Sequence, residues 1–136
     1  MALVVFDSDV LIGFLNRDDA HHAAAVQRVR EALVPGTRRM LCAVNYAEIL
    51  IGPVRAGVED RVRQMLAQLS IEVVSVDSDL AERAAAVRVQ TGLKLPDAFA
   101  LATAVQAERR GHADVELASF DERVRKAYAG LRSDTP

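Results

Sequence analysis

Four acidic residues stand at the ends of apolar runs or at the starts of helix-like segments. They are Asp7, Glu48, Asp97 and Asp121. If the fold brings them together, their carboxylates offer the hard oxygen ligands that Mg²⁺ and Mn²⁺ prefer. The sequence therefore suggests one site that holds one or two divalent cations and activates water against a phosphate ester.

Helix capping is the simpler explanation for each acid taken alone. Asp7 ends an apolar run and could cap the helix that follows. For Asp9, two residues later, we favour a helix cap over a supporting position behind a metal ligand. Glu48 stands three residues after Asn45, which is the spacing of a capping box. The tripeptide Asp-Ser-Asp recurs at 77–79, so this pattern by itself is weak evidence.

Cysteine and histidine offer no competing metal site. The one cysteine, Cys42, lies in an apolar run and is expected in the core. His21 and His22 are adjacent and His112 is in a predicted turn, so their spacing does not fit zinc ligands. We expect all three histidines at the surface.

Length and composition favour one domain, over residues 1–136. Half of the chain is hydrophobic (51%) but only 4% is aromatic, so Ala, Val, Leu and Ile must form the core. The N-terminus has no basic region before its apolar run, and no apolar run is long enough to span a bilayer. We expect a cytoplasmic protein with no membrane association.

The net charge of −2 argues against nucleic-acid binding through a broad basic surface. Phosphate contacts would then have to come from local basic residues. Lys94, Arg38 and Arg39 are the candidates, with Ser119 as a further polar contact, although ordinary surface charge also explains the basic ones.

Short β-branched runs alternate with longer helical patterns along the chain. The predicted strands are 3–6, 40–43, 71–76 and 115–118, and the predicted helices are 20–33, 46–56, 59–69, 80–90 and 96–109. Alternation of this kind predicts an α/β fold with a parallel sheet and helices on both faces. Ligands of such sheets bind beyond the carboxyl ends of the strands, where Asp7 and Asp121 should both lie.

The motifs in this order resemble those of the PIN-domain nucleases, and among them the VapC-type toxins of toxin–antitoxin pairs. The resemblance is carried by Asp7 after the first strand, Glu48 in the helix after the second, Leu-Pro-Asp-Ala at 95–98, and Ser-Phe-Asp at 119–121. It implies a sheet of order 3-2-1-4-5, whose weak fifth strand would fall near 130–132.

The resemblance also implies a function, namely a metal-dependent endoribonuclease. In it, Asp7, Asp97, Asp121 and Glu48 would hold Mg²⁺ or Mn²⁺ and position water, leaving a 5′-phosphate and a 3′-hydroxyl. A VapB-like antitoxin would cover the acidic groove, and the toxin would form a homodimer. Three departures from the usual motifs are Asp9 in place of a small polar residue, Asn45 in place of Ser or Thr, and Ser119 in place of Thr.

Two other functions remain open from the sequence. A phosphatase similar to the haloacid dehalogenases would use Asp7 as its nucleophile and Asp9 as its acid–base, because an apolar strand leads into Asp-x-Asp. A catalytically inactive module of the same fold would bind a partner and keep the acids without using them.

Overall fold

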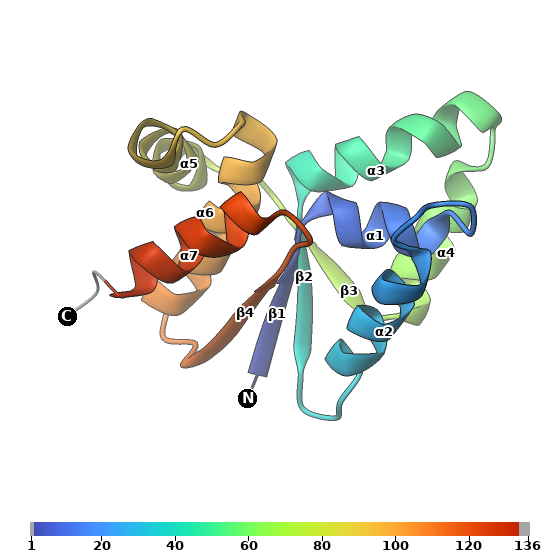
Figure 1. Cartoon of the computed structure of the whole chain (residues 1–136), viewed down its shortest axis with the longest axis horizontal. Helices are drawn as coiled ribbons and strands as arrows, with labels where there is room; N and C mark the ends of the chain where they lie inside the picture. Colours follow the sequence, from blue (N-terminus) through green and yellow to red (C-terminus); the bar gives the residue numbers. More distant parts are fainter. Residues whose placement is uncertain (1, 134–136) are drawn as a thin grey trace.

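The computed structural model describes residues 2–133, and Figure 1 shows a central sheet with helices on either side. In chain order the elements are β1 (Ala2–Phe6), α1 (Ser8–Leu15), α2 (His22–Ala32), β2 (Arg38–Cys42), α3 (Ala43–Ala56), α4 (Glu59–Gln68), β3 (Ile71–Val74), α5 (Ser78–Thr91), α6 (Leu95–Arg109), β4 (Asp114–Ala118) and α7 (Glu122–Ser133). No helix in this part of the chain is long and apolar enough to cross a bilayer.

The strands are all parallel and lie in the order β3-β2-β1-β4. This arrangement confirms the predicted α/β class and the predicted neighbours of the first strand. In the register, Phe6 of β1 lies beside Leu41 of β2 and Ala118 of β4. The residues that follow these strands, Asp7 and Ser119 among them, therefore begin at the same edge of the sheet.

The fifth strand expected near 130–132 is not a strand, because these residues belong to α7. Apolar residues of this segment recur at helical spacing, and Val124 and Tyr128 are buried against the α6 side of the sheet. Partly buried Ala127 and Leu131 extend the same face. Within residues 2–133 the sheet therefore has four strands.

Alternating residues of β1 face two separate cores, because successive side chains of a strand point to opposite faces. Leu3 and Val5 pack with α5, α6 and α7, whereas Val4 and Phe6 pack with α1 to α4. The two groups of helices lie on opposite sides of the sheet in Figure 1. Cys42 is fully buried in the first core, as expected. Because helices cover both faces of the sheet, the residues that follow the strands meet at its carboxyl edge.

Arg38 and Arg39 do not reach that edge, which contradicts their prediction as phosphate contacts. Both begin β2, so they lie at the amino end of a parallel strand. The Arg39 guanidinium donates to the carbonyl oxygens of Leu69 (2.6 Å), Ala32 (2.8 Å) and Thr37 (3.0 Å). Arg39 thus binds the last carbonyls of α4 and α2 to β2.

We expect Arg39→Met to lower the free energy of unfolding by about 2–3 kcal/mol, because three partly buried carbonyls lose a charged donor. Arg38→Met is the matched control: the exposed Arg38–Glu72 ion pair at 2.9 Å should contribute less than about 1 kcal/mol. Urea unfolding of the two variants measures both values. Equal destabilisation would contradict the assigned role of Arg39.

An acidic cluster at the carboxyl edge of the sheet

Asp7 lies at the centre of the candidate site and is only 2% exposed. Its N–H donates to the Ala118 carbonyl (2.9 Å), which continues the β1–β4 pairing by one residue. Its Oδ1 accepts from the Ser8 N–H (2.8 Å) as the N-cap of α1, and its Oδ2 accepts from the Ser119 hydroxyl (2.9 Å). The expected cap role is therefore present, but it uses only one carboxylate oxygen.

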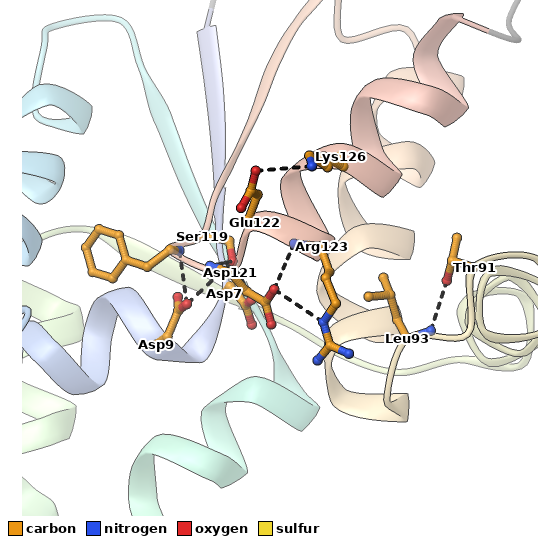
Figure 2. Close-up of polar contacts among 10 residues, drawn as sticks. Asp7, Asp9, Thr91, Leu93, Ser119, Asp121, Glu122, Arg123 and Lys126 are labelled. Carbon is orange, nitrogen blue, oxygen red and sulfur yellow. Dashed lines mark hydrogen bonds and ion pairs between the residues drawn. The ribbon is translucent and has the colours of Figure 1, made fainter.

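Asp9 does not cap α1, which corrects the interpretation favoured from the sequence. Its Oδ2 accepts from the Phe120 N–H (2.9 Å) and, more weakly, from the Ser119 hydroxyl (3.5 Å). Figure 2 shows Asp9 on α1, with Asp7, Ser119 and Asp121 gathered next to it. Asp9 thus ties the start of α1 to the loop that carries Asp121.

Ser119 organises the acids through its hydroxyl, and its contact with a substrate stays a prediction. It is 6% exposed, donates to Asp7 and accepts from the Asp121 N–H (3.1 Å). Asp121 Oδ1 in turn accepts from the Arg123 N–H (2.9 Å), and the Arg123 Nε lies 3.8 Å from the same oxygen. Asp121 therefore occupies the position predicted for it, beside Asp7.

Glu48 and Asp97 approach the cluster from the N-terminal halves of α3 and α6. Asp97 lies in the first turn of α6, as predicted. The Asn45 Nδ2 donates to Glu48 Oε1 (3.0 Å) and to the Pro96 carbonyl (3.1 Å), so Asn45 links α3 to α6. This is not the expected capping box, because α3 already begins at Ala43 and the bond joins two side chains.

The pKa values show that the acids form one electrostatic cluster. Burial, followed by repulsion from Asp9, raises the pKa of Asp7 to about 7, although the Ser119 hydrogen bond acts against this rise. The pKa of Asp97 is raised by burial and then by repulsion from Asp121 and Glu48. Burial also raises the pKa of Asp9. Each of the five carboxylates therefore repels at least one other in the cluster.

The donor chemistry of the cluster fits a hard divalent cation. The oxygens are all of the kind that Mg²⁺ and Mn²⁺ bind, and buried Asp9 Oδ1 and Asn45 Oδ1 have no hydrogen-bond partner in the described part of the chain. Three or more His, Cys, Asp or Glu side chains do not lie close enough in residues 2–133 to form a ready metal cage. Carboxylates with raised pKa values are the expected state of such a site before a cation neutralises them.

The predicted phosphate contact Lys94 is exposed, whereas the histidines differ in their exposure. Lys94 is exposed at the N-cap of α6, so a phosphate contact beside Asp97 stays a prediction. His22 is partly buried, with its Nδ1 2.8 Å from the Gly13 carbonyl, and exposed His21 stacks on Phe120. No sequence pattern points to this ring pair, since the two residues are far apart in the chain.

The sequence matches the family model of the PIN domain over residues 4–130. A solved toxin–antitoxin complex from Klebsiella pneumoniae is similar: the alignment has 31% identity, covers 96% of this chain and 92% of the other, and gives a TM-score of 0.67. The structure of VapBC2 from Rickettsia felis, bound to a DNA fragment from their promoter, shares the fold at 12% identity, with coverage of 86% and 98% and a TM-score of 0.56. No curated protein matches the sequence.

Proposed function

Because this chain belongs to the PIN-domain family, we propose that it is an endoribonuclease dependent on Mg²⁺ or Mn²⁺. The observation that carries the proposal is the cluster of five carboxylates at the carboxyl edge, with the pKa of buried Asp7 at about 7. A divalent cation bound among these carboxylates would offset their mutual repulsion, and it would also bind a phosphate of the RNA.

Each acid has a proposed role in phosphodiester hydrolysis. Asp7, Asp97 and Asp121 would hold the cation, which lowers the pKa of bound water and stabilises charge on the phosphate. Asn45 donates to Glu48 Oε1 and so fixes the carboxylate, whose other oxygen would bind the cation or orient the attacking water. Attack at phosphorus with departure of the 3′ oxygen leaves a 5′-phosphate and a 3′-hydroxyl.

Lys94 would bind a phosphate of the substrate beside this centre. It is exposed at the start of α6, three residues before Asp97. The flexible ammonium of Lys94 can bind a phosphate oxygen as a point charge. It would thereby offset the repulsion between the acidic cluster and the RNA.

We further propose that the protein is the toxin of a toxin–antitoxin pair. The support is the similar chain in the toxin–antitoxin complex from Klebsiella pneumoniae. A VapB-like antitoxin would inhibit the enzyme by covering the acidic edge, where a basic side chain could take the place of the cation. A homodimer and a cytoplasmic location, where RNA is available, complete the proposal.

The phosphatase alternative is disfavoured by the positions of its two key residues. Asp7, its nucleophile, is 2% exposed and accepts two hydrogen bonds. Asp9, its acid–base, already accepts from the Phe120 N–H and is directed into the β4–α7 loop. The nucleophile of a phosphatase would therefore be almost fully buried, and its acid–base would already be engaged through one oxygen.

We predict that Asp9→Asn retains RNA cleavage within about tenfold of wild type, because the amide oxygen can still accept from the Phe120 N–H. Asp9→Ala should lose about tenfold or more, because the loop that carries Asp121 loses its anchor. Asp79→Asn, in the second Asp-Ser-Asp tripeptide, is the matched control and should have no effect. Turnover of a phosphate monoester that Asp9→Asn abolishes would favour the phosphatase instead.

The proposed function is tested by incubating the purified protein with total RNA in EDTA, Mg²⁺ or Mn²⁺. We expect cleavage only with a divalent cation, and fragments that carry a 5′-phosphate. Absence of cleavage under all three conditions, together with tight binding of a protein partner, would favour the non-catalytic module.

A further inference from the structure

Two aromatic rings from distant parts of the chain meet beside the acidic cluster. His21, between α1 and α2, stacks on Phe120, in the loop between β4 and α7. The ring centroids are 5.3 Å apart and the planes are inclined by 25°. His21 is exposed and Phe120 is partly exposed. Since Phe120 stands between Ser119 and Asp121, the ring pair borders the proposed catalytic carboxylates.

Backbone hydrogen bonds fix the two segments that carry the rings. The Phe120 N–H donates to Asp9 Oδ2 (2.9 Å). The His21 N–H donates to Asp19 Oδ1 (2.8 Å), and the His21 carbonyl accepts from the Ala25 N–H (2.8 Å). A ring that stacks on a neighbour and stands on a fixed backbone loses less conformational entropy when a ligand binds to it.

Close packing of α1 against α2 adds a second restraint on His21. A Cβ at Gly13 would lie only 3.2 Å from the Ala25 Cβ and 3.5 Å from the His21 carbonyl oxygen. The neighbouring His22 ring has its Nδ1 2.8 Å from the Gly13 carbonyl oxygen. These contacts fix the position of the His21 segment relative to α1, and α1 begins at the acidic edge.

We propose that His21 and Phe120 form a stacking platform for one unpaired base of the RNA strand, next to the phosphate at the acidic cluster. This inference rests on the proposed ribonuclease function and adds a base-binding site to it. Unpaired RNA bases stack on aromatic side chains, histidine included, and this stacking tolerates different bases. Bases within a duplex are already stacked on each other, so the platform selects single strands and loops.

The first test compares His21→Ala, His21→Phe and the control His112→Ala, which removes a histidine remote from the cluster. Each variant is placed in the Asp97→Asn background, and binding of a short single-stranded RNA with one 2-aminopurine is followed by fluorescence. His21→Ala should weaken binding about tenfold and reduce the quenching of 2-aminopurine. His21→Phe and His112→Ala should behave like the parent chain. With Asp97 restored, His21→Ala should raise KM and leave kcat nearly unchanged.

The second test uses RNAs that each carry one abasic nucleotide near the mapped cleavage site. One abasic position should weaken binding as much as His21→Ala, and the two changes together should be no worse than either alone. A lower unfolding midpoint in His21→Ala with unchanged RNA binding would overturn the proposal, since the rings would then only join two loops. If the wild-type protein cleaves RNA but no abasic position matters, the platform alone is refuted; if it cleaves no RNA, the proposed function fails as well.

Discussion

Asp7→Asn is expected to reduce metal-dependent RNA cleavage by on the order of a hundredfold or more, because the carboxylate proposed to bind the cation at the centre of the cluster is lost. The amide oxygen can still accept from the Ser8 N–H, so the N-cap of α1 persists. The amide nitrogen can donate to the Ser119 hydroxyl, which then keeps its place between the acids. The loss of activity would thus reflect the charge and not the fold, as measured by initial rates on a mapped RNA substrate.

The chain contains a matched control for this substitution. Asp77 begins the second Asp-Ser-Asp tripeptide and caps α5 by accepting from the Leu80 N–H (2.8 Å). It has the same local sequence and the same capping role as Asp7, but it follows β3 and lies outside the cluster. Asp77→Asn should leave cleavage unchanged, and an equal loss in both variants would mean that helix capping, not cation binding, explains the result.

The metal-free protein should lose about 4 kcal/mol of unfolding free energy as the pH rises from about 4 to above 7. The pKa of Asp7 is 3.8 in the reference state and about 7 in the folded chain, a difference of about 3 units. Between these values the folded state binds more protons than the unfolded state, so stability falls with rising pH. The pKa values of Asp9 and Asp97 are raised too, and they act in the same direction.

Urea unfolding in EDTA at several pH values measures this slope. Asp7→Asn should remove most of it and make the metal-free chain more stable than wild type at neutral pH. Mg²⁺ or Mn²⁺ should restore stability in the wild type, by about 2.7 kcal/mol at a hundredfold excess over the dissociation constant. A metal-free protein whose stability rises between pH 4 and 7 would contradict the raised pKa of Asp7.

Local patterns predicted the carboxyl edge well. An apolar run before Asp7 and another before residues 119–121 identified two strands, and parallel pairing then required their ends to meet. Leu-Pro-Asp at 95–97 predicted the start of α6, because Pro and an acid both suit a first helical turn. Each of these predictions depends only on residues that are close together in the sequence, and local patterns describe such residues well.

Long-range contacts account for the errors. Asp9 reads as a cap from its neighbours, yet its partner is Phe120, more than a hundred residues away. Arg39 reads as a surface cation, and three carbonyls from separate segments bind it. The segment 130–132 became part of α7 because a helical face there packs on α6 and β4. Pairings of this kind depend on the tertiary fold, which local patterns do not encode.

The rate of RNA cleavage against Mg²⁺ concentration, for wild type and for Asp97→Asn, tests the central claim most directly. Asp97 is the acid whose pKa reflects repulsion from Asp121, Glu48 and Asp9 together, so its carboxylate connects most of the cluster. We predict a rate that rises and saturates with Mg²⁺ for the wild type, is abolished by EDTA, and stays at background for Asp97→Asn at every concentration. Cleavage by the wild type in EDTA, or a wild-type rate in Asp97→Asn, would contradict a carboxylate-bound cation as the basis of the activity.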